Sequence, residues 1–329
     1  MASASEEPVD EFERIRRFFA PLAAPGGLGL LDDAALVDCR AGRQLVVTAD
    51  AIVEGVHYLP DDPPDTVARK LLRVNLSDLA AMGARPLYYL VTTALPATRS
   101  ADWVAAFARG LADDQQRFMV SLLGGDSVAS PGAAALSLTA IGEISAGMAI
   151  RRSGAVAGDL IWVSGTIGDA CLGLDVLRGA YPQLASEYRT ALVNRFRIPD
   201  PRVELGPQLV GLAHAMIDVS DGLLADLGHI CETSHVAATV ELQALPLSKP
   251  ARAIVDWQPE LRPSLAVGGD DYELLFTAPP SASGPIEELS SELGLPITLI
   301  GTVSPGQGVR LLDALGRAVP VVQVGYRHF

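Results

Sequence analysis

Apolar positions spaced three and four residues apart predict an amphipathic helix over about residues 66–82. Thr66 is placed to cap the start of this helix, and Gly83 is placed to end it. Asn75 and Asp78 stand three residues apart, so an amide and a carboxylate are expected on one helical face. Spacing alone is as consistent with an ordinary amphipathic helix as with a polar working edge.

Apolar runs elsewhere predict that strands and helices are mixed in both halves of the chain, which favours an α/β or α+β protein with two domains. We expect strands at 44–48, 87–95, 120–123, 133–144, 159–164, 215–219, 237–242, 274–278 and 297–303. We expect helices at 10–22, 101–116, 169–178, 184–196, 202–214, 223–233 and 286–293. A polar, turn-rich run from Ile150 to Gly158 predicts a boundary between an N-terminal domain (1–149, with 1–9 disordered) and a C-terminal domain (150–329).

Composition narrows the class of protein. The chain has 329 residues, 49% of them hydrophobic, and no apolar run approaches the length of a membrane span. No signal peptide is recognisable, so we expect a cytoplasmic protein. Its three cysteines are far apart and form no CxxC pair, so a disulfide framework or a zinc site is not expected. A formal net charge of −14 without a basic block argues against nucleic-acid binding.

The two lysines, Lys70 and Lys249, exclude one kind of phosphate chemistry. Neither follows a glycine, so the chain lacks the Gly-Lys-Ser/Thr of a P-loop. No GxGxxG opens a helix after a strand either. An anionic ligand would therefore need another source of positive charge, such as a divalent metal ion held by the excess carboxylates.

One device recurs along the chain: an apolar strand ends or begins at a tight turn that bears aspartate. The instances are Asp32-Asp33, Asp50, Gly124-Gly-Asp126, Asp218-Val-Ser-Asp221 and Gly268-Gly-Asp-Asp271. Paired glycines allow backbone to approach a ligand closely. Asp218 and Asp221 flank a helix start, where free backbone N–H groups favour phosphate oxygens. Several aspartates without His or Cys partners suit Mg²⁺ better than Zn²⁺, although each aspartate alone is better explained as a turn former or helix cap.

Five segments, in this order, resemble the thiamine-monophosphate kinase family within the superfamily of aminoimidazole-ribonucleotide synthetase. They are Val74-Asn-Leu-Ser-Asp-Leu-Ala-Ala-Met-Gly-Ala84, Leu123-Gly-Gly-Asp126, Ile217-Asp-Val-Ser-Asp-Gly-Leu223, Gly268-Gly-Asp-Asp-Tyr-Glu-Leu-Leu-Phe276 and Gly325-Tyr-Arg-His-Phe329. The resemblance covers about residues 12–329. It implies ATP-dependent phosphorylation of thiamine monophosphate to thiamine diphosphate, and a homodimer in which the N-terminal sheets pair.

The resemblance also implies site residues. Metal-binding positions are matched by Asp33, Thr48, Asp50, Asp78, Asp126, Asp218 and Asp221. Nucleotide contacts are matched by Gly125, Asp126, Arg152 and Ser220, and thiamine phosphate contacts by His57, Asp270 and Tyr326. Asp78, Asp126 and Asp221 are the predicted catalytic carboxylates, with several Mg²⁺ ions and ATP as cosubstrate. Tyr326 can stack on a flat heterocycle, and the Asp270 carboxylate can pair with the cationic, amino-bearing thiamine. Arg152 can bind phosphate.

Three positions depart from the family pattern. Leu31 replaces the usual glycine before the first aspartate pair, Ala49 replaces a usual hydroxyl residue, and Asp270 replaces a usual glutamate. These changes bear on ligand geometry rather than on the reaction. Competing interpretations are another ATP-dependent enzyme of the superfamily, such as an aminoimidazole-ribonucleotide synthetase, and a non-catalytic nucleotide-binding paralogue. A reactive cysteine typical of selenophosphate synthetases is absent before Cys39.

Overall fold

The computed structural model describes residues 13, 15–30, 35 and 37–320, and the contacts divide the chain into two compact units. Unit 1 comprises Met1–Asn75 and Pro86–Glu143, and unit 2 comprises Leu76–Arg85 and Ile144–Phe329. Helix α2 (Pro64–Ala81) contributes residues to both. The boundary predicted between residues 149 and 150 stays a prediction, and residues 1–9, predicted to be disordered, lie outside the described residues.

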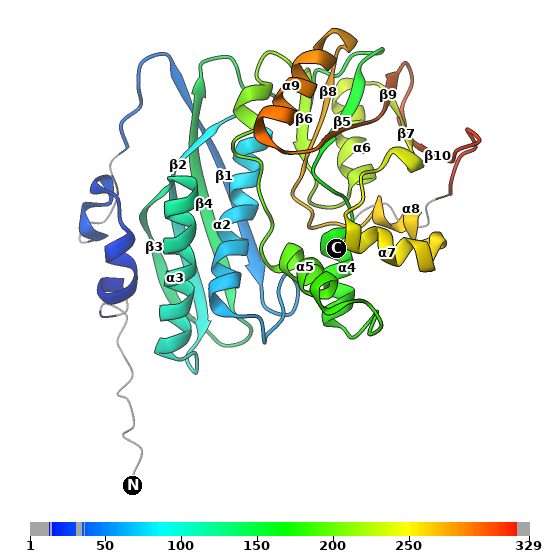
Figure 1. Cartoon of the computed structure of the whole chain (residues 1–329). Coiled ribbons are helices and arrows are strands. Elements are labelled where there is room, and N and C mark those ends of the chain that lie inside the picture. Colours follow the sequence, from blue (N-terminus) through cyan, green and yellow to red (C-terminus); the bar gives the residue numbers. More distant parts are fainter. Residues whose placement is uncertain (1–12, 14, 31–34, 36, 321–329) are drawn as a thin grey trace. The chain divides into compact units, whose positions relative to one another are not determined.

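Unit 1 is built on a four-stranded sheet with the order β1-β4-β2-β3. The strands are β1 (Arg43–Val53), β2 (Arg85–Pro96), β3 (Ser121–Ser130) and β4 (Ala135–Ser145). Figure 1 shows α2 and α3 (Ala101–Phe118) lying along one face of this sheet. Among the described residues before β1, the chain forms the short helical segments η1 (Ile15–Phe19), η2 (Ala20–Leu22) and η3 (Pro25–Leu30).

Alternation along the strands explains why only one face of the sheet forms a core. Tyr89 and Val91 of β2, and Leu136 and Leu138 of β4, are buried, whereas the residues between them are more exposed. Within unit 1, Arg73 of α2 makes a bidentate ion pair with Asp114 of α3, at 2.6 and 2.8 Å. Both side chains are buried, so this pair fixes the two helices against each other.

The predicted helix after Pro63 is confirmed, with one correction at its start. It begins at Pro64 rather than at Thr66, whose hydroxyl donates to the Pro63 carbonyl from inside the first turn. It ends as expected at Gly83, which has a φ of +73°. The Gly83 N–H donates to Ala80 and the N–H of the next residue donates to Leu79, a pairing that satisfies the last carbonyls of a helix.

Unit 2 is built on a six-stranded mixed sheet with the order β10-β7-β9-β5-β8-β6. Its strands are β5 (Leu160–Ser164), β6 (Ala215–Asp218), β7 (Ala237–Glu241), β8 (Leu274–Ala278), β9 (Ile297–Ser304) and β10 (Gly308–Leu312). Its helices are α4 (Asp169–Leu177), α5 (Ser186–Arg197), α6 (Leu223–Ser234), α7 (Lys249–Trp257), α8 (Arg262–Leu265) and α9 (Ser283–Leu293). Strand β10 pairs parallel with β7, and the other pairs are antiparallel.

The sheet of unit 2 buries both faces. Ile161 and Val163 of β5 pack into one apolar cluster together with the face of α6, while Trp162, which lies between them, packs into another with Ile286 of α9. A third apolar cluster joins α4, α5, α7 and α8. The strand predicted at 274–278 is confirmed as β8, and it is buried throughout, as expected for a strand covered on both sides.

The helix predicted over 202–214 is wrong. Only Gly206–Leu209 forms a single 3₁₀ segment, η4. Pro207 lacks a backbone donor, and a Cβ on Gly206 would lie 2.1 Å from the carbonyl oxygen of Ala80. This segment is therefore shaped by close packing against the end of α2. Among the described residues, no helix is both long and apolar enough to cross a membrane.

Candidate active site

Strand β1 carries two of the predicted metal ligands on one face. Thr48 and Asp50 are half-buried and lie two residues apart, so their side chains point to the same side. The prediction that Asp50 ends its strand is wrong, because β1 continues to Val53. The N–H of Asp50 donates to Oδ1 of Asn75 at 3.0 Å, and Nδ2 of Asn75 donates to the Leu71 carbonyl of its own helix. Asn75 is fully buried and fixes the backbone that carries Asp50.

His57 lies in a turn that is held from two sides. Its Nδ1 accepts the N–H of Val53 at 3.1 Å, so the neutral ring carries its proton on Nε2. Its carbonyl accepts from Nζ of Lys70 at 2.9 Å, and Lys70 is only 2% exposed. A buried ammonium group needs polar partners, so Lys70 ties the turn to α2. The result is an ordered, half-buried imidazole.

Gly124-Gly-Asp126 lies inside a strand rather than in a turn, which corrects the sequence prediction. Strand β3 runs through Ser130 and pairs parallel with β2, so Gly125 faces Val91. A Cβ on Gly125 would lie 1.8 Å from the Val91 carbonyl oxygen, so only glycine permits this approach. Asp126 is exposed, and its Oδ1 accepts the N–H of Ser127 at 2.8 Å. The carboxylate therefore stands at the open side of the sheet.

A pocket of about 400 Å³ opens beside this carboxylate. Its apolar lining includes Phe19, Leu90 and Leu122, and its polar lining includes Asp126 and Thr92. A cavity of this size that combines apolar walls with a few polar groups is typical of small-molecule sites. Gly124 and Gly125 also line it, so backbone forms part of its wall.

In unit 2, Asp78 and Asp218 belong to neighbouring segments. Asp218 ends β6 and is 3% exposed, and its Oδ2 accepts the hydroxyl of Ser77 at 2.7 Å. Ser77 directly precedes Asp78, which is half-buried within an otherwise buried stretch of α2. This contact places the end of β6 next to the turn of α2 that carries the predicted catalytic carboxylate.

The start of α6 differs from its prediction. The backbone N–H groups of Ser220, Asp221 and Gly222 donate to Oδ2 of Asp226, at 3.0, 3.1 and 3.1 Å. They are therefore engaged by the protein's own carboxylate rather than offered to phosphate. Burial, reinforced by the Asp221 carboxylate, raises the pKa of Asp226 to about 7, although the three hydrogen bonds favour its ionised form. Ser220 and Asp221 themselves are half-buried beside this cap.

Asp270 stands in a loop whose backbone is unusual. Asp270 has a φ of +70°, and Tyr272 has a φ of +51°. Residues other than glycine rarely adopt a positive φ. The Asp270 N–H donates to the Ser220 carbonyl, and the Tyr272 N–H to Val219, both at 2.8 Å. The Tyr272 hydroxyl donates to Oδ1 of Asp270 at 3.2 Å. The loop thus holds the predicted substrate carboxylate next to the Ser220–Asp221 turn.

Arg152 is exposed, so its side chain is accessible to a ligand from solvent. Its backbone is ordered by Ser234, whose hydroxyl donates to the Arg152 carbonyl at 3.3 Å. The same hydroxyl accepts the N–H groups of Gly154 and Ala155. Two predicted site residues, Asp33 and Tyr326, lie outside the described residues, as does Leu31.

The donor chemistry of the predicted ligands fits Mg²⁺, because they are carboxylates and one hydroxyl. In the part of the chain that the structure describes, no three His, Cys, Asp or Glu side chains gather into a ready-made metal site. Mg²⁺ is commonly held by one or two carboxylates together with waters and substrate phosphates. The exposed carboxylate of Asp126, beside the pocket of unit 1, therefore has the donor chemistry for an ion that is bound together with a nucleotide.

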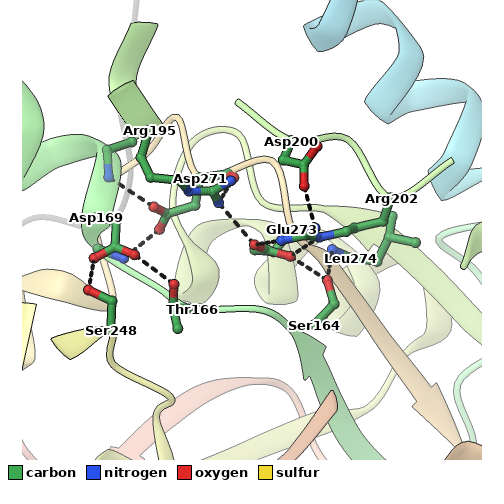
Figure 2. Close-up of polar contacts among 12 residues, drawn as sticks. Ser164, Thr166, Asp169, Arg195, Asp200, Arg202, Ser248, Asp271, Glu273 and Leu274 are labelled. Atoms are coloured by element: carbon green, nitrogen blue, oxygen red, sulfur yellow. Dashed lines mark hydrogen bonds and ion pairs between the residues drawn. The ribbon is translucent and has the colours of Figure 1, made fainter. Parts of the chain in front are cut away.

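The buried residues that hold the site were not predicted from the sequence. Asp226 caps the Ser220 turn, and Ser77 contacts Asp218. Asp271 and Glu273, predicted only as parts of a turn, are fully buried in a polar network with arginines (Figure 2). Asp226 lies four to six residues after the amides it accepts, a spacing that identifies it only once the turn's geometry is known.

Comparison with known proteins covers both units. Residues 31–144 match the family model described as AIR synthase related protein, N-terminal domain, and residues 156–314 match its C-terminal domain. Thiamine-monophosphate kinase of Caulobacter vibrioides is 42% identical over 332 residues, covering 99% of this chain and 93% of that protein.

Two solved structures are similar over nearly the whole chain. The crystal structure of thiamine-monophosphate kinase from Stenotrophomonas maltophilia K279a has a TM-score of 0.82 at 41% identity, covering 96% of this chain and 98% of that chain. The structure of AaThiL complexed with AMPPCP and TMP has a TM-score of 0.79 at 30% identity, covering 98% of this chain and 97% of that chain.

Proposed function

This chain belongs to the thiamine-monophosphate kinase family of AIR-synthase-related proteins, and we propose that it transfers the γ-phosphoryl group of ATP to thiamine monophosphate. The products are thiamine diphosphate and ADP. The observation that carries the proposal is the pocket beside Gly125 and Asp126, where a close-packed glycine and an exposed carboxylate border an apolar cavity. Such a pocket suits a nucleotide, whose base has flat aromatic faces that pack against apolar walls and whose phosphates need polar partners and metal.

We infer direct in-line transfer. An oxygen of the substrate's monophosphate forms a bond to the γ-phosphorus while the bond from that phosphorus to the β,γ-bridging oxygen breaks, and ADP leaves. The attacking oxygen is already anionic, so no general base is required and positioning dominates. The proposed nucleotide contacts are Gly125, Asp126, Arg152 and Ser220, and the proposed thiamine phosphate contacts are His57, Asp270 and Tyr326.

Several Mg²⁺ ions, when bound, would neutralise the phosphate oxygens of two anionic substrates. The proposed ligands are Asp33, Thr48, Asp50, Asp78, Asp126, Asp218 and Asp221. The protein's own part is to hold these groups in place: Asn75 fixes the backbone at Asp50, and Ser77 donates to Asp218. Because Asp226 already caps the Ser220 turn, we assign phosphate binding to Arg152 and to bound metal rather than to the amides of that turn.

We also propose a homodimer that pairs the sheets of unit 1. One side of β1 is exposed at every alternate position and includes Leu45 and Val47, with Val47 60% exposed. Val128 of β3 is 47% exposed as well. Leu45 and Val47 are neighbours on the exposed side of β1, and a contiguous apolar surface on a sheet is typical of an interaction site. Val47→Asp should convert a dimer to a monomer in sedimentation analysis, and a monomeric parent protein would contradict the proposal. Location in the cytoplasm stays a prediction.

The decisive experiment supplies purified protein with ATP, Mg²⁺ and thiamine monophosphate and follows thiamine diphosphate by its fluorescence after oxidation. Asp78→Asn should greatly reduce turnover and leave the fold intact, and near-normal turnover at saturating Mg²⁺ would remove Asp78 from the catalytic set. Absence of product, with aminoimidazole ribonucleotide formed from its precursor instead, would favour the related synthetase. Nucleotide binding without any turnover would favour a non-catalytic paralogue.

A further inference from the structure

The loop of residues 268–273, which we name the Asp270 loop, alternates between two environments. Asp271 and Glu273 are fully buried, whereas Asp270 and Tyr272 are half-buried and hydrogen-bonded to each other. Asp270 and Tyr272 are also the residues with positive φ. Two neighbouring departures of this kind persist only where surrounding contacts enforce them, and they are concentrated at functional sites.

The buried residues of the loop are held by contacts from strand β5, the start of α4, helix α5 and the segment that carries Arg202 (Figure 2). The Asp271 carboxylate accepts the N–H groups of Gly168 and Ala170, at 2.6 and 3.2 Å, and so caps the start of α4. The Glu273 carboxylate accepts from Ser164 at 2.6 Å, and from two arginines, Arg195 and Arg202. The network leaves neither carboxyl group without a polar partner, which a buried polar group requires.

The two arginines differ in what else they hold. Arg202 donates to Glu273 through Nε at 2.6 Å and to Asp200 through Nη1 at 2.9 Å. Arg195 donates from one nitrogen, Nη2, both to Oε1 of Glu273 and to the backbone carbonyl of Asp271, each at 2.9 Å. Arg195 therefore contacts the backbone of the Asp270 loop as well as its buried carboxylate. The carbonyl that it contacts lies between the two residues with positive φ.

The loop backbone in turn sets where Asp270 stands relative to Ser220. The Asp270 N–H donates to the Ser220 carbonyl at 2.8 Å. A Cβ on Gly269 would lie 2.3 Å from the same oxygen, so the two segments are in tight contact. A rotation of the peptide at Asp271 would therefore displace the Asp270 carboxylate from the turn that carries two predicted ligand residues.

We propose that Arg195 is a positioning residue for Asp270, acting through the Asp271 carbonyl and assisted by the Tyr272 hydroxyl. The inference rests on the proposed function, in which Asp270 contacts the amino-bearing, cationic heterocycle of the substrate. It predicts that losing Arg195 weakens binding of thiamine monophosphate while nucleotide binding is retained. Arg195 itself touches neither substrate in this role.

The test compares Arg195→Met with Arg202→Met, because each removes one arginine from the buried Glu273. Both variants should unfold at lower temperature than the parent protein. We expect Arg195→Met to raise the KM for thiamine monophosphate about 10-fold or more, with the KM for ATP changed less than about 2-fold. Arg202→Met should leave both KM values within about 2-fold. Equal KM effects of the two variants, or an unchanged KM in Arg195→Met, would overturn the proposal.

Two milder variants test the positioning role of Arg195 if Arg195→Met does not fold. Arg195→Lys retains a cation that can reach one of the two acceptors, and it should recover part of the affinity. Tyr272→Phe removes one hydroxyl, and we expect a rise of about 3-fold or more in the KM for thiamine monophosphate without a change in melting temperature. An unchanged KM in both would overturn the proposal. The parent protein is measured in the same assay. If it turns over thiamine monophosphate, the proposed function holds, and an unchanged KM in the variants then contradicts only the role of Arg195.

Discussion

The tripeptide Gly-Gly-Asp occurs at two predicted site positions, and the two copies adopt different structures. Gly124-Gly-Asp126 is extended inside β3, and Asp126 is exposed on an open sheet. Gly268-Gly-Asp270 lies in a loop where Asp270 has a positive φ. In both, the middle glycine is pressed against a backbone carbonyl, at 1.8 and 2.3 Å from a hypothetical Cβ. In both copies the middle glycine allows another backbone segment to approach closely. The residues that follow each tripeptide determine where the aspartate carboxylate points.

The residues after each tripeptide explain the difference. The chain beyond Asp126 continues a parallel pairing with β2, so the backbone stays extended. Beyond Asp270 come Asp271 and Glu273, which are drawn into the polar network of unit 2 and turn the backbone away from strand geometry. Changes in the first copy should therefore affect catalysis and sheet packing, and changes in the second should affect substrate binding.

The largest effect is expected from Asp126→Asn. Loss of one anionic oxygen at the proposed metal and nucleotide site should lower kcat by about 10³-fold, equivalent to about 4 kcal/mol of transition-state stabilisation. Because Asp126 is exposed, the melting temperature of the protein should change little. Steady-state kinetics over a range of Mg²⁺ concentrations measures this. A variant that recovers full turnover would place Asp126 outside the catalytic set.

Gly125→Ala should have the next largest effect, on stability. The added methyl group would overlap the Val91 carbonyl oxygen, so β2 and β3 must move apart, and the free energy of unfolding should fall by about 3 kcal/mol. Gly124→Ala is the matched control, because its Cβ would lie 3.8 Å from the nearest atom, a side-chain carbon of Leu90. Chemical denaturation of both variants distinguishes them. Equal losses would mean that Gly125 is not held at this distance in solution.

Asp270→Asn should act on binding rather than on turnover. Removing the charge that we propose to face the cationic substrate should raise the KM for thiamine monophosphate about 10- to 20-fold, or about 1.5 kcal/mol, with kcat reduced less than about 3-fold. Asp126→Asn in the same assay supplies the opposite pattern. If both variants changed kcat alone, the proposed division between the two tripeptides would fail.

The last effect concerns the pH dependence of stability. Burial raises the pKa of Asp271 from an unfolded value of 3.8 to about 8. The folded state therefore holds this proton more tightly, and the associated stability is present below pH 3.8 and is lost as the pH rises towards 8. The stability advantage of the parent protein over Asp271→Asn should shrink by about 1 kcal/mol or more between about pH 5 and about pH 8. Denaturant titrations at several pH values measure this, and an advantage that grows with pH would contradict the buried, raised pKa.

The elements with strong local signals could be predicted from the sequence. Periodic apolar positions and Gly83 were sufficient for α2, and a short apolar run after Glu273 was sufficient for β8. The helix predicted over 202–214 was wrong because Pro207 and the contact of Gly206 with α2 override its apolar spacing. Helix α7 was missed, although its cap, Ser248, is a typical one whose side chain accepts the Ala251 N–H.

The candidate site divides in the same way. The motifs around Asp78, Asp126, Asp218 and Asp270 could be recognised because glycine and aspartate at turns and strand ends leave a pattern along the chain. The capping of the Ser220 turn by Asp226 could not be predicted, because the start of α6 has the same sequence pattern as a helix start whose backbone amides are free. Only the tertiary structure shows that three of those amides are already engaged.

By itself, the sequence determined the mixed α/β class, the aspartate-rich chemistry and the family resemblance, since each depends on residue type and order. The tertiary structure decided which carboxylates are exposed and which are buried. Asp126 directly follows a pair of glycines, and Asp271 comes one residue after the Gly-Gly-Asp tripeptide that ends at Asp270. Asp126 nevertheless faces solvent, whereas Asp271 is fully buried and has a raised pKa. The physical reason is that the environment of a carboxyl group depends on segments distant in sequence, such as the start of α4, where the N–H of Gly168, 103 residues away along the chain, donates to the Asp271 carboxylate at 2.6 Å.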